Sequence, residues 1–278
     1  MKIAKPKYLK VQVQLQKRDK KVLHFIHRFR ICTLSQIHKG FFNEAQKISC
    51  FRRVRMLESS GYLKSHNLRF GLEKIYRLSL KGCSAIGVYD QELSRKGENI
   101  RVYSSQIPHD LALVDIAIAL QSLPFKFNYL SENEIRSKFK DSWEGYICDG
   151  ALIIKEPLQY VLGIEFEYVI KSEKQYLEKF QALAFDKTNY NHYLYILEDI
   201  ELRHGFIRQA LKLKEITGYN LSERLLFVEL KALRSNASLA PIYTAQGSSF
   251  TFNDFYQKLI NAYYNTPYIK PKSDSLTA

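Results

Sequence analysis

A chain of 278 residues, of which 46% are hydrophobic, 13% aromatic and 25% charged, has the composition of a folded protein and enough length for two domains. No apolar run approaches the roughly 18 residues of a membrane-spanning helix, and the basic N-terminal segment lacks the apolar core of a secretory signal. The net charge of +14 is confined to residues 1–100, with 22 Lys and Arg against 7 Asp and Glu, whereas the remainder holds 20 against 21, which indicates a polyanion-binding module on a neutral body.

Residues 18–79 are predicted to form three helices followed by a β-hairpin. Apolar residues recur at helical spacing over 18–30. A second helix is expected to begin at Thr33, because Gln36 follows three residues later as in a capping box. The third begins at Asn43 and ends at Gly61, which supplies a left-handed stop. Its apolar residues are expected to face the first two helices, and they are Ile48, Phe51, Val54 and Leu57.

Two β-like runs follow, at 62–66 and 74–79, joined by a turn that contains Gly71. Three helices and a hairpin in this order predict a winged helix-turn-helix that binds duplex DNA. In that fold the third helix enters the major groove and the hairpin touches the adjacent backbone. We assign residues 18–90 to this domain, with a basic arm over 1–17, a short helix within 79–87 and a polar linker over 91–106.

The predicted DNA contacts are polar and basic residues of the third helix and the hairpin. Arginine can pair with phosphates or with guanine edges, and lysine and serine near the helix start are placed for base edges. The alternative for any one arginine is a structural ion pair, for instance with Glu58. A winged helix that binds RNA or protein is a further alternative, which the charge excess disfavours. The predicted contacts are Lys47, Ser49, Arg52, Arg53, Arg55, Arg69 and Lys74.

From Pro108 onwards strands alternate with helices, which predicts an α/β domain with a mixed sheet over 107–264. Residues 235–249 are expected to be loop, and 265–278 a disordered tail. The expected strands are 125–130, 148–154, 158–169, 192–197 and 224–230. The expected helices start at Pro108 and cover 172–185, 201–218 and 251–264.

Acidic residues at two of these strands carry the candidate chemistry. Asp149 opens one strand and Glu165 lies in the next, where strand alternation puts Glu167 on the same face. Two carboxylates that converge with a backbone carbonyl are hard ligands suited to Mg²⁺ or Mn²⁺. A nearby lysine would stabilise the negative charge that develops in phosphodiester cleavage. Alternatively, Glu165 and Glu167 form structural ion pairs with Lys171, Lys174 or Lys179.

These motifs resemble the PD-(D/E)XK restriction-endonuclease-like fold. The segments PHDLALVD, CDGALII and IEFEYVIKSEKQYLEKFQAL, together with the winged helix, are similar to the replication-relaxation family of mobile-element proteins over most of residues 18–197. The resemblance implies a role in replication, transfer or transposition-type processing of plasmid or other mobile-element DNA. It makes Asp149 the first acid of the motif and Glu165 the second, with Glu132 or Glu134 as an additional upstream acid.

The sequence departs from the motif at two positions. Cys148 replaces a structural proline, and Glu167 replaces the catalytic lysine, for which Lys171 or Lys174 would be a migrated substitute. The resemblance therefore implies a metal-dependent nuclease, active or decayed. The candidate catalytic residues are Asp149, Glu165, Glu167 and Lys171, and the candidate metal ligands are Asp149 and Glu165, with Glu134 as a third.

The alternative function is a non-enzymatic transcriptional or replication regulator whose α/β domain mediates dimerisation or partner binding. Both hypotheses make double-stranded DNA the main partner, joined by a second copy of the chain or other mobile-element proteins, with no membrane. Both also place the protein in the cytoplasm, on the nucleoid or a plasmid. The four cysteines lack CxxC spacing, which favours reduced thiols over a zinc site.

Overall fold

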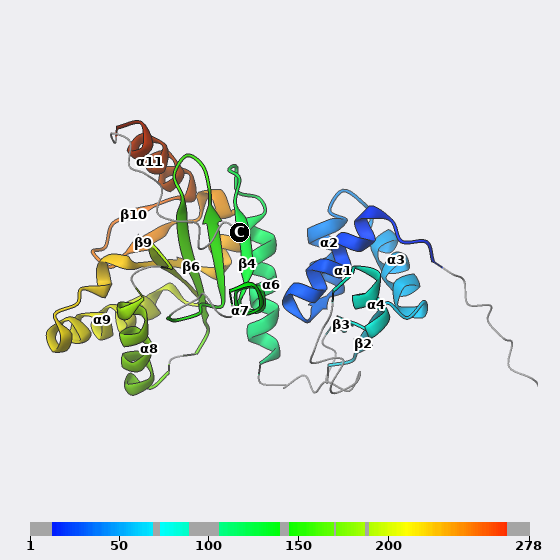
Figure 1. Cartoon of the computed structure of the whole chain (residues 1–278), viewed down its shortest axis with the longest axis horizontal. Coiled ribbons are helices and arrows are strands. Elements are labelled where there is room, and N and C mark those ends of the chain that lie inside the picture. Colours follow the sequence, from blue (N-terminus) through cyan, green and yellow to red (C-terminus); the bar gives the residue numbers. More distant parts are fainter. Residues whose placement is uncertain are drawn as a thin grey trace, which may run out of the picture. The chain divides into compact units, whose positions relative to one another are not determined.

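The computed structural model describes residues 13–68, 73–88, 106–139, 145–169, 171–186 and 189–265. The chain divides into two compact units, Met1–Val114 and Asp115–Ala278, and each is described by itself (Figure 1). Most of the expected basic arm, the hairpin turn with Arg69 and Gly71, nearly all of the linker over 91–106 and the tail beyond 265 lie outside the described residues.

The first unit holds the three helices and two strands expected over 18–79, although the third helix begins at Lys47 rather than at the expected Asn43. A strand of two residues, which was not expected, completes an antiparallel sheet of order β1-β3-β2. The helices are α1 (Lys17–Phe29), α2 (Leu34–Phe41), α3 (Lys47–Ser59) and α4 (Leu80–Ala85). The strands are β1 (Cys32–Thr33), β2 (Leu63–His66) and β3 (Ile75–Leu78).

Local signals account for the helix ends. Thr33 Oγ1 accepts the Gln36 amide at 3.2 Å and Gln36 Oε1 accepts the Thr33 amide at 3.0 Å, so the predicted capping box of α2 is confirmed. Gly61 follows α3 with φ of +78°, the left-handed conformation that glycine adopts without strain. These two residues fix where α2 begins and where the chain leaves α3.

The predicted inner face of α3 is partly wrong. Ile48 and Phe51 are 46% and 40% exposed, whereas Val54 and Leu57 are buried as predicted, together with Cys50. Because an α-helix turns by about 100° per residue, Ile48 points away from a stripe that contains Cys50, two residues later. The thiol of Cys50 packs as a small apolar group and so belongs to the inward face.

The second unit is built on a mixed seven-stranded sheet of order β10-β9-β8-β7-β6-β5-β4, which confirms the predicted α/β class. The strands β6, β7 and β8 run parallel, and the other neighbours pair antiparallel. The strands are β4 (Asn128–Ser131), β5 (Gly150–Ile154), β6 (Tyr160–Glu167), β7 (His192–Leu197), β8 (Leu225–Glu229), β9 (Ile242–Thr244) and β10 (Ser249–Phe250).

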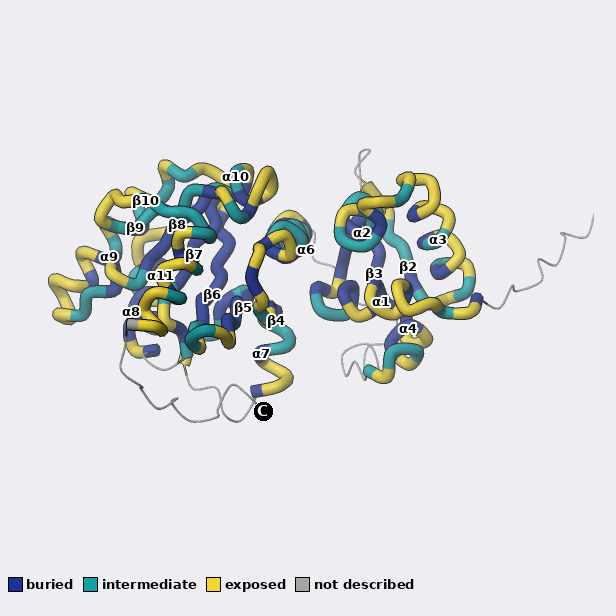
Figure 2. The backbone as a smooth tube through the Cα atoms, turned by 90° about the horizontal axis from the view of Figure 1, so that it is seen from above, coloured by how far each residue is buried: buried dark blue, intermediate teal, exposed yellow. Residues whose placement is uncertain are grey.

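Helices α8 and α9 pack on one face of this sheet through Phe180, Leu183, Phe206 and Leu213. Figure 2 shows the buried central strands and the outer, exposed sides of the helices. From residue 107 onwards the helices are α6 (Ile107–Leu120), α7 (Glu132–Lys138), α8 (Glu173–Phe185), α9 (Arg203–Thr217), α10 (Leu230–Ser235) and α11 (Phe252–Asn265). Short 3-10 helices cover Ile200–Leu202, Leu221–Arg224 and Ala237–Leu239.

Four short elements lie where the sequence predicted loop or no element, namely α7, α10, β9 and β10. Each has seven residues or fewer, too short to show a hydrophobic period. Across the described segments, no helix is both long and apolar enough to span a membrane.

Candidate functional site

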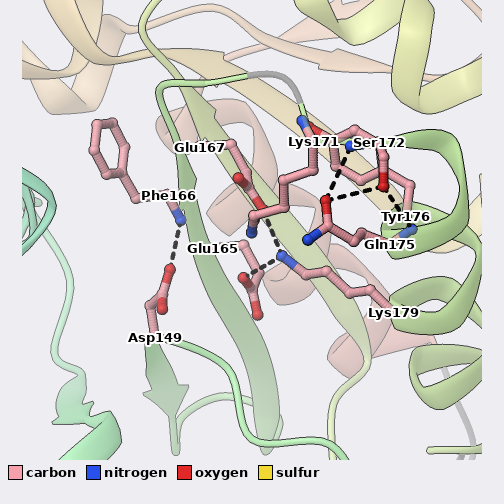
Figure 3. Close-up of polar contacts among 9 residues, drawn as sticks. All are labelled: Asp149, Glu165, Phe166, Glu167, Lys171, Ser172, Gln175, Tyr176 and Lys179. Carbon is pink, nitrogen blue, oxygen red and sulfur yellow. Dashed lines mark hydrogen bonds and ion pairs between the residues drawn. The ribbon is translucent and has the colours of Figure 1, made fainter. Parts of the chain in front are cut away.

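The centre of the candidate site is an ion-pair cluster between β6 and α8. Strand alternation turns Glu165 and Glu167 to the same side of β6, and Lys179 of α8 reaches both of them (Figure 3). Lys179 Nζ donates to Glu165 Oε2 and to Glu167 Oε1, each at 2.7 Å. The side chains of Lys179, Glu165 and Glu167 are 9%, 3% and 4% exposed, so these charges are almost fully withdrawn from water.

The amphipathic pattern of α8 places Lys179 in this cluster. The helix begins after Ser172, whose hydroxyl accepts the Gln175 amide, and it buries Tyr176, Phe180 and Leu183. Lys179 lies three residues after Tyr176 and four before Leu183, and therefore on the inward side. Its ammonium also lies 5.0 Å from the ring centre of Tyr195.

Asp149 lies beside Glu165, on the neighbouring strand. The antiparallel register pairs Gly150 with Ile164, so the preceding residue, Asp149, comes opposite Glu165. Asp149 Oδ2 accepts the Phe166 amide at 2.9 Å, which ties the carboxylate to β6. The structure thus brings the two acids of the predicted site together.

Burial dominates the electrostatics of Glu165. Loss of water around it raises the pKa of Glu165 to about 7, and the charges of Asp149 and Glu167 act in the same direction, against the opposing effect of Lys179. For Lys179 burial alone would lower the pKa, but the surrounding acidic groups, Glu165 first, hold it well above its ordinary value. The lysine is therefore charged, and burial is what raises the pKa of Glu165 towards neutral pH.

The remaining predicted residues fall partly inside and partly outside this cluster. Lys171 donates to Glu167 Oε1 at 2.7 Å from a side chain that is 44% exposed. Lys174 lies 3.9 Å from Glu178 and is not part of the cluster. Glu132 pairs with Arg136 at 2.7 Å, and Glu134 accepts the Ser131 amide at 3.0 Å as part of the capping box of α7. The two upstream acids therefore have local structural contacts in α7.

The catalytic assignment from the sequence omitted Lys179, which had been considered only as a structural partner. The signal that identifies it is a lysine at an otherwise apolar position of an amphipathic helix. Such a lysine is buried only when it is paired, and the acids of β6 are its partners.

The donors at the cluster fit a hydrated divalent cation. Glu165 Oε1 is buried and has no hydrogen-bond partner in the part of the chain that the structure describes, and Asp149 lies opposite Glu165 on the neighbouring strand. Mg²⁺ is commonly held by one or two carboxylates while it keeps several waters. No group of three or more His, Cys, Asp or Glu suited to a metal occurs among the described residues.

A second candidate surface is the outward side of α3. Its polar members Lys47, Ser49, Arg52 and Arg55 are exposed. Within the described ranges the side chains of Arg52 and Arg55 have no ion pair or hydrogen bond, so both guanidinium groups face solvent. Lys74, just before β3, is exposed as well, whereas Arg69 lies outside the described residues.

Arg53 is placed differently and is removed from the predicted set of DNA contacts. Its Nε donates to Asp19 Oδ1 at 2.9 Å and its Nη2 to Asp19 Oδ2 and to the Gln14 carbonyl. The Asp19 side chain is 1% exposed and that of Arg53 15%. The pair ties α3 to α1, while Glu58, the partner considered from the sequence, accepts from Ser65.

Comparison with known proteins gives one family match. Residues 23–134 match the family model described as replication-relaxation. No curated protein and no solved structure matches the chain. The matched segment runs from α1 to the start of α7 and ends before the cluster of Glu165, Glu167 and Lys179.

Proposed function

We propose that the first unit is a winged helix that binds duplex DNA of a mobile element. The match of residues 23–134 to the replication-relaxation family model supports a mobile-element role. The observation that carries the proposal is the outward side of α3, where Arg52 and Arg55 are exposed and have no protein partner among the described residues. The net charge of +15 over residues 1–100 gives this unit a strong attraction for polyanions.

In this proposal α3 enters the major groove. Arg52 and Arg55 lie three residues apart and hence on one side of the helix, where they contact phosphates or guanine edges. Arg53 is a positioning residue, because its buried pair with Asp19 fixes α3 against α1. Lys74, just before β3 at the turn end of the hairpin formed by β2 and β3, contacts the neighbouring phosphate backbone.

The salt dependence of binding tests this assignment. Each phosphate contact releases counterions. The negative slope of the logarithm of the binding constant against the logarithm of the salt concentration therefore becomes shallower by about 0.9 for each contact removed. We expect the double variant Arg52→Ala/Arg55→Ala to bind a labelled duplex more weakly and with a shallower slope, as measured by fluorescence anisotropy. Lys212→Ala/Lys214→Ala removes the same charge from the exposed side of α9 and serves as the control.

If the two double variants show the same affinity and the same slope, α3 is not the DNA-binding element. If the intact chain binds no duplex at low salt, the proposed function is wrong as a whole. Thermal unfolding of each variant confirms that a loss of binding is not a loss of fold.

A second candidate function is metal-dependent DNA cleavage by the α/β unit. The unpaired Oε1 of Glu165 beside Asp149 favours it. Asp149 and Glu165 would hold Mg²⁺ or Mn²⁺, which supplies Lewis-acid activation of a water molecule when bound. Lys179 carries the positive charge that the motif normally places at the position of Glu167. Glu167 holds the Lys179 ammonium in place, and Lys171 offsets the negative charge of Glu167.

Nicking of a supercoiled plasmid with Mg²⁺ or Mn²⁺ distinguishes the two candidates. Cleavage by the intact chain that is lost in Asp149→Ala and in Glu165→Gln, but kept in Glu178→Gln, supports the enzyme. Glu178 is an exposed acid of α8, which makes it a matched control. If the plasmid stays supercoiled with the intact chain in the presence of either metal, the cleavage hypothesis is wrong, while the proposal of DNA binding still stands.

A further inference from the structure

The outward side of α3 combines charged residues with large apolar residues. Ile48 and Phe51 are 46% and 40% exposed and lie outside the buried stripe of Cys50, Val54 and Leu57. Ile48 lies four residues before Arg52, and Phe51 lies four residues before Arg55. Residues at this spacing are neighbours on a helix surface, so each arginine has an apolar side chain one turn before it.

This alternation indicates what the surface binds. A partner that is only anionic would bind the arginines and leave the isoleucine and phenylalanine without a contact. An apolar protein groove would bind the apolar side chains and bury the arginines without a partner. The DNA major groove presents both chemistries, because phosphates line its edges and the C5 methyl group of thymine projects into it. The charge excess of the first hundred residues selects this partner over an apolar protein surface.

We propose that Ile48 and Phe51 contact thymine methyl groups and so make the protein prefer sites that contain A·T pairs at defined positions. The inference rests on the proposed binding of DNA by α3. Both residues lie in the first turn and a half of the helix, the part of a recognition helix that contacts base edges. Met56 is 40% exposed too, but it lies in the last turn and is not assigned to this contact.

Uracil in place of thymine tests the proposal, because it keeps the base pairing and removes only the methyl group. A duplex is first selected from a random library for tightest binding to the intact chain. Every thymine in it is then replaced by uracil. Burial of one methyl group contributes a factor of about four to affinity, so two contacts predict a loss of roughly fifteenfold for the uracil duplex.

Alanine variants of α3 test which residues cause the preference for thymine. We expect Ile48→Ala and Phe51→Ala each to bind the thymine duplex more weakly and to lower the ratio of the affinities for the thymine and uracil duplexes. In the double variant Ile48→Ala/Phe51→Ala this ratio should be close to one. Phe51→Leu keeps part of the ratio, and Met56→Ala keeps all of it. Arg52→Ala/Arg55→Ala weakens binding to both duplexes by the same factor.

Equal affinity of the intact chain for both duplexes overturns the inference and leaves DNA binding by α3 standing. A thymine preference that persists in Ile48→Ala/Phe51→Ala also overturns it, because other residues would then contact the methyl groups. If no duplex is enriched or bound, the proposed function itself is wrong.

Discussion

The Lys179 ammonium and the Glu165 carboxylate, 14 residues apart, form a buried ion pair of 2.7 Å that joins α8 to β6. The same ammonium bridges to Glu167, so one lysine compensates two carboxylates that are almost without water. Removal of charges from water costs several kcal/mol per ion, which only close and well-oriented partners offset. The three charges therefore depend on one another, and loss of Lys179 leaves Glu165 without a lysine partner and Glu167 with only the half-exposed Lys171.

Lys179→Met should destabilise the α/β unit by about 3–5 kcal/mol, the usual effect of removing one partner of a buried pair. Chemical denaturation of the intact chain and the variant measures the difference. Lys174→Met is the matched control on the same helix, because the Lys174 side chain is 86% exposed, and it should stay within about 0.5 kcal/mol. Equal effects of the two substitutions would show that the cluster contributes nothing to stability.

The pair of Arg53 and Asp19 predicts a comparable coupling in the first unit. Asp19→Ala should cost about 3–5 kcal/mol, because it leaves the partly buried Arg53 unpaired and removes the acceptor of the Gln16 amide. In a double-mutant cycle with Arg53→Met, the two effects should be non-additive by about 0.5–3 kcal/mol. Additive losses would contradict a direct interaction between the two side chains.

Local sequence signals sufficed where a few neighbouring residues determine the structure. Thr33 with Gln36 and the glycine at 61 gave the ends of α2 and α3 because capping and left-handed backbone are short-range effects. The mixed sheet followed from alternating strands and helices, and strand alternation put Glu165 and Glu167 on one face. These features depend on spacing alone.

Long-range pairing was beyond such signals. Arg53 reaches Asp19 across 34 residues. It lies three residues after Cys50 and four before Leu57, and therefore on the inward side of α3, a spacing that is apparent only when Cys50 is counted as apolar. The inward side of α3 was misassigned because Cys50 was not counted as apolar, although it is fully buried. Strands as short as β9 and β10 depend on a paired edge, which β8 offers to β9 and β9 offers to β10.

Gly163, in the middle of β6, gives a test of packing beside the site. A Cβ atom there would lie 2.8 Å from Cys148 Sγ and 3.0 Å from the rings of Tyr190 and Tyr193. Gly163→Ala should therefore destabilise the unit by about 1–3 kcal/mol through overpacking. At Gly205 of α9 nothing lies within 4 Å of the added carbon, so Gly205→Ala should be neutral or stabilising by up to about 1 kcal/mol.

Thermal unfolding of the two alanine variants compares them within one unit. The expected order of melting temperatures is Gly205→Ala at or above the intact chain, with Gly163→Ala below it. A melting temperature of Gly163→Ala equal to that of the intact chain would mean that Cys148 and the two tyrosines move aside at no cost.

His192, the first residue of β7, predicts how stability depends on pH. Its ring stacks on Tyr160 with centroids 5.8 Å apart, and Nδ1 contacts the Tyr160 hydroxyl. Burial first, and the positive charge of Arg224 second, lower the pKa of His192 below its ordinary value of 6.5. The unfolded chain therefore takes up the proton more readily than the folded protein.

A lowered histidine pKa stabilises the fold above the unfolded value of about 6.5 and loses that effect as the pH falls below it. The contribution of His192 to the free energy of unfolding should consequently decrease between about pH 7.5 and 5.5, while Glu165, whose pKa is raised to about 7, contributes in the opposite direction. The difference in free energy of unfolding between the intact chain and His192→Asn should therefore shift in favour of the variant as the pH falls, because asparagine does not titrate. His204→Asn, which replaces a histidine of α9 that is 60% exposed, should follow the intact chain. Parallel pH profiles for the intact chain and His192→Asn would show that protonation of His192 is not coupled to folding.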